Sequence, residues 1–592
     1  MVTTMLTNTD SGTINPLAFY SRVFKRILPT AFLVLLLTAL CTLFFVPVPL
    51  WKFGINEFIA SVLQLENWEL FRKSVNYLDR NSPQSQFQQF WALSMQSQFY
   101  ILLPIVFLST LIGSKRSHQI YSLFLCCIIV FSSSLYYSVT YIDKSPEQSY
   151  FNTFMRIWEF FLGVIVAIVY PYFNPNNIPK IIITLITTII VLLFITFGFW
   201  VPSTLNFPGW IALVPTFSIA IFILLAKETQ TKGIVTLLKN KYISNIGKFS
   251  FTLYLCHWPI LTFYQHYLNR SQLTFFEGLN VIILAITISS ILYYFFENPL
   301  QKKMKAINVL PSLVIYVTLV LILTLGGLYA RQHLINIAQT RASIQVANSN
   351  VLDGVDFGDI DFNYWLTVDY DRPYAVEDCR GKVCYFGDKE SDKVVVLLGQ
   401  SHAAHYQAFF ESMAHKYRFQ LVTVITHPDS FNTIKKINPD FLISSGTVTA
   451  EPGSQKDERI AKEYSEIWNY FSKSGVPILL IRDTPRFNFY QNGCLWKKHT
   501  GNLKLNEDCT IKRSDIYKTT NPLKTFKEPG VSTIDFSDLV CDKTICFSEL
   551  NGLPIYYDKH HFTNRFILSN SNKLLEEMKL QAPDFYESLA EQ

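Results

Sequence analysis

The sequence is poor in charged residues. Only 16% of its 592 residues are Asp, Glu, Lys or Arg, whereas a soluble protein has about a quarter. The shortage is concentrated before about residue 330, where long apolar runs dominate, and charge becomes ordinary afterwards. This pattern excludes a wholly soluble protein. It predicts a membrane half followed by a soluble half.

The sequence also lacks a strong charge of either sign. Its net charge is +6, and it contains no helix-turn-helix, zinc-finger or RNA-binding signature. We therefore expect no nucleic-acid partner. The lipid bilayer is the expected partner of the first half, and we expect no metal ion and no bound cofactor.

Nine segments are apolar and long enough, or nearly so, to cross a bilayer. Basic residues concentrate in the loops before the first, after the second, before the seventh and before the ninth segment, and the positive-inside rule places such loops in the cytoplasm. With an odd number of crossings, we expect a cytoplasmic N-terminus and residues 331–592 outside. The segments are roughly 30–50, 99–113, 119–142, 154–173, 180–201, 208–226, 248–268, 276–297 and 307–330.

Cysteine is scarce, and its placement agrees with two halves. Four of the ten cysteines (Cys41, Cys126, Cys127 and Cys256) fall in membrane segments, where cysteine packs as a small apolar residue. Local pairs in an exported domain favour disulfides. Zinc is the alternative, although thiolate ligands usually have tighter spacing or histidines nearby. The disulfide candidates are Cys379 with Cys384, Cys494 with Cys509, and Cys541 with Cys546.

The stretch VVVLLGQSHAAHY, residues 394–406, joins a buried strand to a helix through Gly399 and Ser401. A serine on such a turn lies where backbone N–H groups converge, which suits a nucleophile whose intermediate is negatively charged. An ordinary turn has the same pattern. Strand-like stretches (FQLVTVIT, PDFLISSG and VPILLIRDTP) then alternate with helical ones, which predicts an α/β sandwich with a parallel sheet.

The stretch YYDKHHFTNRF places Asp558 three residues before His561. A serine that attacks, a histidine that carries its proton and an aspartate that fixes the tautomer form an acyl-transfer site. Alternatively, Asp558 caps the following helix and the histidines are solvated. We expect His402, His405 and His560 to be non-catalytic surface residues on helices or loops.

LLGQSHAAHY, followed by CDKTICFSELNGLPIYYDKHHFT, resembles the SGNH hydrolase-like domain that is fused to membrane acyltransferases. The resemblance covers about residues 394–592 and implies a three-layer α/β fold with Ser401 as nucleophile, His561 as base and Asp558 as its partner. The chain departs from that family at Gln400, where the family has aspartate. The oxyanion-hole residues are not recognisable.

The membrane half is similar to acyltransferase family 3 (AT3), the integral membrane enzymes that O-acylate cell-surface glycans. FYSRVFKRILP, FWALSMQSQFYILLP, RIWEFFLG, SNIGKFSFTLYLCHWPIL and YYFFENPLQKK occur in the family order. The resemblance implies an AT3-like domain over 1–306, an added helix over 307–330, a linker with a disulfide over 331–393 and an extracytoplasmic SGNH-like domain over 394–592.

Several charged residues of the membrane half are candidates for the acyl donor site or the transfer path. Arg22 and Arg26 suit the phosphates of acyl-CoA, or they only set topology. Arg156 and Glu159 share a helix face and line a polar cavity or form a structural ion pair. His257 is functional or bonds between helices. Glu297 at a cytoplasmic helix end has a role there or only reaches the interface.

Two departures from the AT3 family bear on activity. The family has glutamate where this chain has Gln96, and it begins with two further helices that carry an arginine and a histidine. The chain therefore starts upstream of Met1 or is a shortened relative. We expect acyl groups, in the simplest case acetyl from acetyl-CoA, to cross the bacterial inner membrane and pass through Ser401 to an envelope glycan such as lipopolysaccharide O-antigen. The alternatives are a membrane-anchored carbohydrate esterase and an inactive relative.

Overall fold

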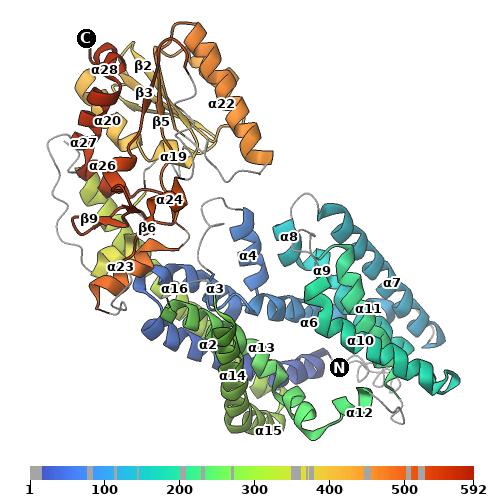
Figure 1. Ribbon diagram of the computed structural model, residues 1–592. Helices are drawn as coiled ribbons and strands as arrows, with labels where there is room; N and C mark the ends of the chain where they lie inside the picture. Colours follow the sequence, from blue (N-terminus) through green and yellow to red (C-terminus); the bar gives the residue numbers. More distant parts are fainter. Residues whose placement is uncertain are drawn as a thin grey trace. The chain divides into compact units, whose positions relative to one another are not determined.

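The computed structural model divides the chain into two compact units, labelled by element in Figure 1. Unit 1 consists of Met1–Val46 and Phe53–Arg331, and unit 2 consists of Pro47–Lys52 and Gln332–Gln592. The structure describes residues 16–75, 84–111, 116–142, 146–200, 208–227, 234–268, 272–347, 362–368, 371–372, 379–445, 455–487, 489–501, 508–517 and 527–591.

Unit 1 is helical throughout its described residues, as expected where no water is present to bond an open backbone. Each of the nine expected membrane segments overlaps a helix. The helices are α2 (Pro16–Phe45), α3 (Trp51–Val62), α4 (Glu66–Val75), α6 (Phe90–Leu111), α7 (Arg116–Tyr141), α8 (Pro146–Phe151), α9 (Thr153–Val169), α10 (Lys180–Trp200), α11 (Leu213–Leu225), α12 (Ile234–Leu238), α13 (Lys241–Leu268), α14 (Phe275–Leu292), α15 (Asn298–Ala306) and α16 (Val309–Ala347).

Six helices among the described residues are both long and apolar enough to cross a membrane, which makes this a membrane protein. A seventh, Trp210–Leu225, is apolar but shorter. The expected count of about nine crossings is therefore only loosely supported. The six are Pro16–Phe45, Phe90–Leu108, Ile120–Tyr141, Lys180–Phe199, Phe275–Lys305 and Val309–Ile337.

The core of unit 1 is apolar, with buried side chains from α2, α6, α7, α9 and α13. Pro29, Pro104 and Pro259 lie inside three of these helices, and membrane helices tolerate proline because neighbouring groups satisfy the freed carbonyls. Between α14 and α15 the chain forms a π-helical turn, Tyr293–Glu297. Such turns are frequent at functional sites, and this one brings Glu297 into the interior.

Unit 2 is built on a six-stranded sheet whose order is β1-β3-β2-β4-β5-β7. The four expected strands are present, and they pair in parallel together with β7. The edge strand β1 runs antiparallel to β3, so the expected parallel sheet is in fact mixed. The strands are β1 (Val383–Gly387), β2 (Val394–Gly399), β3 (Gln420–Ile425), β4 (Phe441–Ser445), β5 (Ile478–Ile481) and β7 (Val531–Ile534).

Helices cover both faces of the sheet and make three layers. Alternate strand residues such as Val396, Leu442 and Leu480 pack against Ile467 and Trp468 of the helix α22 (Gln455–Lys473). On the other face, α20 (Gln407–Tyr417) contacts β1 and β3, and α27 (Ser571–Gln581) contacts β7. The single helix expected after the turn at Gly399 and Ser401 is in fact interrupted, because α19 (Ser401–Ala404) ends before α20 begins.

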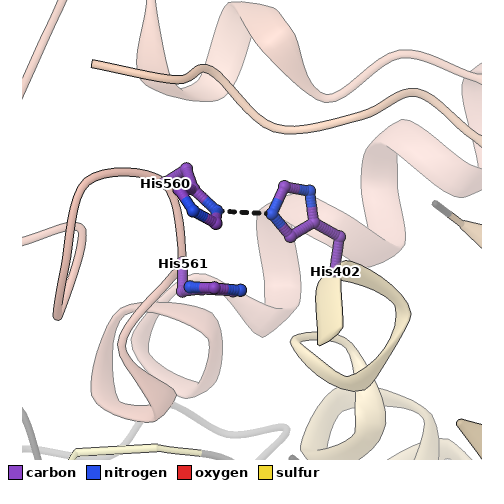
Figure 2. Close-up of side chains that lie close together, drawn as sticks. All are labelled: His402, His560 and His561. Carbon is purple, nitrogen blue, oxygen red and sulfur yellow. Dashed lines mark hydrogen bonds between the residues drawn. The ribbon is translucent and has the colours of Figure 1, made fainter. Parts of the chain in front are cut away.

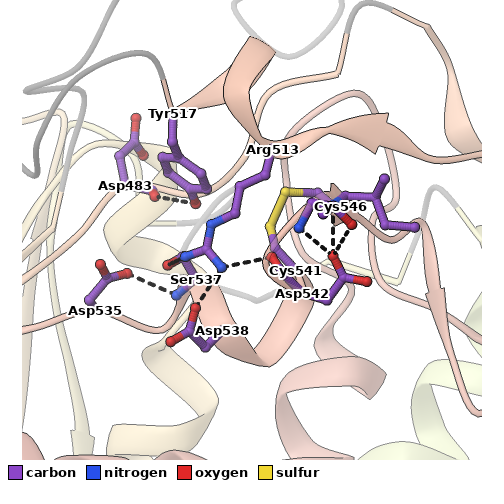
Figure 3. The surroundings of a disulfide bond; sticks show 11 residues. Asp483, Arg513, Tyr517, Asp535, Ser537, Asp538, Cys541, Asp542 and Cys546 are labelled. Carbon is purple, nitrogen blue, oxygen red and sulfur yellow. Dashed lines mark hydrogen bonds and ion pairs between the residues drawn. A yellow bond between two sulfur atoms is a disulfide. The ribbon is translucent and has the colours of Figure 1, made fainter.

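All three expected cysteine pairs are joined as disulfides in the structure. Figure 3 shows the pair Cys541–Cys546, beside which Arg513 bonds Ser537 and pairs with Asp538. The cross-link joins β8 (Ile545–Cys546), which pairs with β6 (Ile511–Lys512), to the residue after the short helix α25 (Ser537–Val540). The three disulfides close short loops with sequence separations of 5, 15 and 5 residues, and such cross-links stabilise a fold mainly by restricting the unfolded chain.

Candidate active site in unit 2

Ser401 lies where β2 ends and α19 begins. Gly399 ends the strand with φ +155°, and a Cβ there would lie 1.9 Å from the carbonyl oxygen of Ser445 and 2.6 Å from the Cβ of Ala403. Only glycine allows β4 and α19 to approach so closely. Ser401 is therefore presented at the carboxyl edge of the sheet, where open α/β sheets bind their ligands, and it is only 4% exposed.

The turn before α26 (Asn564–Ser569) brings a base and a carboxylate to Ser401. His561 Nε2 lies 2.8 Å from Ser401 Oγ, and His561 Nδ1 lies 2.5 Å from Asp558 Oδ2. The imidazole stacks flat on the ring of Tyr557, with the two rings 5° from parallel. Nucleophile, base and carboxylate are thus hydrogen-bonded in the order that acyl transfer requires.

Asp558 organises the turn as well as the base. Its Oδ1 accepts hydrogen bonds from the backbone N–H groups of His560 and His561, at 2.9 and 2.8 Å. The helix that follows is capped by Thr563 instead, so the alternative in which Asp558 caps this helix does not hold. Burial alone would raise the pKa of Asp558, but His561, His560 and these hydrogen bonds hold it well below its usual value. The carboxylate stays ionised and keeps a proton on His561 Nδ1.

Side chains around the start of α23 (Gln491–His499) support the turn from outside. The Tyr490 hydroxyl and the Asn492 amide both donate to the carbonyl of Tyr557, at 2.9 and 3.0 Å. The Gln491 amide donates to the carbonyl of Lys559 at 3.0 Å. Because the carbonyls of Tyr557 and Lys559 are both hydrogen-bonded, the turn is held in place, and the His561 ring has little freedom to leave Ser401.

The three other histidines of this region are not surface residues, and that expectation is wrong. His402, His405 and His560 are all buried, because α19 and the turn pack against each other at the sheet edge. Figure 2 shows the rings of His402 and His560 facing each other beside His561. Burial lowers the pKa of His402, His405 and His560 well below the usual value, so these rings are neutral at pH 7.

Three histidines of the cluster lie close enough together to hold a metal ion. Ring nitrogens of His402, His560 and His561 lie within 4.8 Å of one another. However, His402 Nε2 is only 2.7 Å from His560 Nδ1, which is a hydrogen-bond distance, and His561 already bonds Ser401 and Asp558. A metal would have to break the triad to gain three ligands. The cluster fits a hydrogen-bonded network better than a metal centre.

Unit 1 contains a polar cavity of about 550 Å³. It lies beside the N-terminal half of α2, which carries the predicted arginines. Arg26 and Lys248 supply positive charge, and Gln96, Glu297 and Gln301 supply polar groups. Glu297 is buried and bonds Thr252 and Gln301, so it belongs to the cavity and does not reach for the interface. Two cations beside amide groups suit a phosphorylated ligand.

The other candidates of the membrane half lie elsewhere in unit 1. Arg22 is exposed on α2. Arg156 forms an ion pair with Glu159 at 2.6 Å, and its guanidinium lies over the rings of Trp91 and Tyr150. His257 is exposed, and its Nδ1 lies 2.6 Å from the carbonyl of Tyr254 in the same helix. None of these four is among the residues that line the cavity.

Sequence reasoning missed Lys248 and Asp483. Lys248 is one of the basic residues before the seventh apolar segment, which the sequence explains by topology alone, although it lines the cavity. Asp483 directly follows β5 and bonds His402. The signal for Asp483 was available, since polar residues just after a parallel strand gather at the same sheet edge as Ser401.

Comparison with known families agrees with this division into two halves. The acyltransferase domain family matches residues 4–294, and the SGNH domain fused to AT3 domains matches residues 369–569. Residues 4–294 thus form an acyltransferase domain, and residues 369–569 form an SGNH domain of the kind that is fused to AT3 domains.

Several relatives of this chain come from Staphylococcus aureus. Two proteins named O-acetyltransferase OatA, from strains NCTC 8325 and COL, are each 28% identical over 309 residues, 50% of this chain and 50% of the relative. A third, from strain COL and named O-acetyltransferase only provisionally, is 28% identical over 310 residues, 51% of this chain and 50% of the relative. The chain thus spans about half the length of these relatives.

One solved structure also resembles the chain, the periplasmic domain of a lipopolysaccharide acetyltransferase from Salmonella ser. Paratyphi A. It is 14% identical, and the match covers 33% of this chain and 84% of that chain with a TM-score of 0.26. A likeness of this degree carries no argument about function.

Proposed function

We propose that this protein is an O-acyltransferase that moves an acyl group from cytoplasmic acyl-CoA to a hydroxyl of an envelope glycan, such as lipopolysaccharide O-antigen. The group is acetyl in the simplest case, and it passes through an ester on Ser401. The observation that carries the proposal is the hydrogen-bonded order Ser401–His561–Asp558 in a chain with an acyltransferase domain. Relatives named for O-acetyl transfer support acetyl as the group.

The triad can carry out both halves of the transfer. Ser401 Oγ attacks the carbonyl of the acyl group on the carrier that delivers it across the membrane, while His561 Nε2 takes the serine proton. The bond between the acyl group and its carrier breaks, and His561 gives the proton to the departing carrier. In the second half, a glycan hydroxyl gives its proton to His561 and attacks the Ser401 ester. Ser401 leaves and recovers the proton, so no other reactant is needed. Asp558 stabilises the imidazolium in both steps.

The cavity of unit 1 supports acyl-CoA as the donor. Arg26 and Lys248 line it from α2 and α13, and two cations are the side chains expected to meet the phosphates of coenzyme A. Tyr100 and Phe251 also line it and offer aromatic surface to the adenine ring. The Glu297 carboxylate also lines the cavity and accepts hydrogen bonds from Thr252 and Gln301.

The path of the chain supports a cytoplasmic donor site and an extracytoplasmic Ser401, in a bacterial inner membrane. Arg26 lies near the start of α2, and the residues after its end, Pro47–Lys52, belong to unit 2. A helix of 30 residues is about 45 Å long, enough to cross a bilayer. By the positive-inside rule, the basic first half of α2, which includes Arg26, is cytoplasmic.

The first prediction concerns the Ser401 ester. The full chain in lipid nanodiscs, incubated with labelled acetyl-CoA and quenched in acid, is expected to carry one acetyl group on the peptide that contains Ser401. Ser401→Ala should abolish that label and the hydrolysis of p-nitrophenyl acetate, since the remaining triad members have no nucleophile. Peptide mass spectrometry measures the label.

Ser430→Ala is the matched control, because Ser430 is also a buried first residue of a helix, Ser430–Ile437. It should keep both label and hydrolysis. Full hydrolysis in Ser401→Ala would contradict the triad. Hydrolysis that depends on Ser401 but yields no label from acetyl-CoA would instead favour an esterase, in which water takes the place of the glycan hydroxyl.

A further inference from the structure

A second chain of hydrogen bonds lies beside the triad, and the reaction described above does not use it. His402 Nδ1 bonds the carboxylate of Asp483, and His402 Nε2 lies 2.7 Å from His560 Nδ1 (Figure 2). Asp483 follows β5, His402 follows the nucleophile, and His560 precedes the base. All three side chains are buried, so the chain is part of the interior of unit 2.

The proton positions in this chain follow from the carboxylate at its end. Burial holds the pKa of His402 and of His560 well below the usual value, so each ring is neutral and carries one proton. An ionised carboxylate can only accept, which places the proton of His402 on Nδ1. His402 Nε2 then accepts the Nδ1 proton of His560. Asp483 thereby sets the tautomer of both rings.

His560 is also held through its backbone. The Thr484 hydroxyl donates to the carbonyl of His560 at 2.9 Å and lies 3.2 Å from His402 Nδ1. The N–H of His560 donates to Asp558. Ring, carbonyl and N–H of His560 are therefore all fixed, and His561 follows directly in the chain. Its ring lies only 4.0 Å from that of His560.

The carboxylate end of the chain is itself supported. The Tyr517 hydroxyl donates to the carbonyl of Asp483 at 3.3 Å (Figure 3), and Arg486 lies 3.6 Å from the carboxylate. Because the Asp483 carboxylate is buried, it stays in place only if the Nδ1–H of His402 remains as a hydrogen-bond donor beside these partners. The second chain is thus built on a stable base.

We propose that Asp483 and His402 are positioning residues that hold His560, and with it the turn of Asp558 and His561, at hydrogen-bond distance from Ser401. The inference rests on the proposed acyl-enzyme and deepens it, since it assigns a role to the histidine next to the nucleophile. Neither residue touches the acyl group. Their contribution is to keep His561 within reach of the serine proton.

The test is the steady-state hydrolysis of p-nitrophenyl acetate by the full chain in nanodiscs. His402→Leu removes both bonds of the ring and should lower kcat by about 10²-fold with KM little changed, because misplacing a base by about 1 Å costs that much. His402→Gln should recover most of kcat, since its amide can donate to Asp483 and accept from His560. Asp483→Asn should lower kcat, because the new amide N–H can donate to His402 Nδ1 and so reverse the tautomers of His402 and His560.

His405→Phe is the control. His405 is equally buried and stacks on His402, yet its ring nitrogens have no hydrogen-bond partner among the described residues, so kcat should stay near the wild-type value. Equal losses in His402→Leu and His405→Phe, or no rescue by glutamine, would overturn the inference in favour of simple packing.

Ser401→Ala, measured in parallel, separates this inference from the proposed function. If Ser401→Ala abolishes hydrolysis while His402→Leu and Asp483→Asn keep full kcat, the triad stands and the positioning role is refuted. If Ser401→Ala has no effect, both fail. If His402→Leu does not fold, as judged by its melting profile, the comparison of Asp483→Asn with wild type decides.

Discussion

Gly399 is the single residue that most constrains how the nucleophile is presented. Its strand pairs with both β3 and β4, opposite Ile425 and Ser445, and the next turn must leave the sheet at once. The missing Cβ makes room for the Ser445 carbonyl. Any larger residue has to push β4 away from α19, and Ser401 would move with α19.

Gly399→Ala is therefore expected to abolish the Ser401-dependent hydrolysis of p-nitrophenyl acetate and to lower the apparent melting temperature of the full chain. A backbone oxygen 1.9 Å from the new Cβ cannot give way as a flexible side chain could. Gly475→Ala is the control, because Gly475 has φ +83° but open space around its Cβ. It should cost only the backbone strain, about 1–2 kcal/mol, and wild-type hydrolysis in Gly399→Ala would refute the close approach.

At the scale of elements, α19 and the turn before α26 enclose four histidines, and the proposed acyl transfer uses only His561. His402 and His560 belong to the second hydrogen-bonded chain. His405 packs against the ring of Phe562. Two short elements that meet face to face at a sheet edge thus create a buried polar site that neither could form alone.

This packing predicts that unit 2 loses stability in mild acid. For each histidine whose pKa is lowered by burial, the unfolded chain binds a proton below the ordinary value of 6.5 and the folded chain does not. Stability is then full above about pH 6.5 and falls as the pH drops, by up to about 1.4 kcal/mol per pH unit for each such histidine.

The measurement is the apparent melting temperature of the full chain between about pH 7 and pH 5, where a decrease is expected. His405→Phe should weaken the dependence on pH, because it removes one of the three buried rings and leaves no new unpaired group. The carboxyl of Asp558 contributes in the same direction only at lower pH, since its pKa is lowered from an already acidic value. An unchanged slope in His405→Phe would contradict the buried neutral state of that ring.

At the scale of the whole molecule, the two sites belong to separate units and recognise different chemistry. The cavity of unit 1 is lined by two cations, two amides and the Glu297 carboxylate, whereas Ser401 lies in a buried interior beside histidines and the Asp558 carboxylate. Donor binding and ester chemistry should consequently be separable by mutation.

Arg26→Ala and Lys248→Ala are expected to raise KM for acetyl-CoA by about tenfold each, which corresponds to losing one charge-assisted hydrogen bond of about 1.5 kcal/mol. Neither should change the hydrolysis of p-nitrophenyl acetate at Ser401. The control is Lys241→Ala, because Lys241 begins the same helix as Lys248 and is exposed but does not line the cavity. A similar rise in KM for Lys241→Ala would mean that only overall charge matters.

Some features of this protein followed from local sequence alone. Apolar length determines the membrane helices, and the β-branched runs determine β2, β3, β4 and β5, because both depend on a residue and its near neighbours. The triad could also be predicted, since Asp558 and His561 are close in sequence and Ser401 follows a strand. The three cysteine pairs were predictable for the same reason.

Other features depend on which segments meet in space. β1 pairs directly with β3, although β2 lies between them in the sequence. Its antiparallel direction has no sequence signature. His402 and His560 look like solvated residues until α19 and the turn enclose them, and Asp483 gains its role only because β5 ends at the same sheet edge as β2. Lys248 and Glu297 join Arg26 because α13 and the π-helical turn pack beside α2. Burial, partner choice and proton position are properties of the packed chain, so only the tertiary structure decides them.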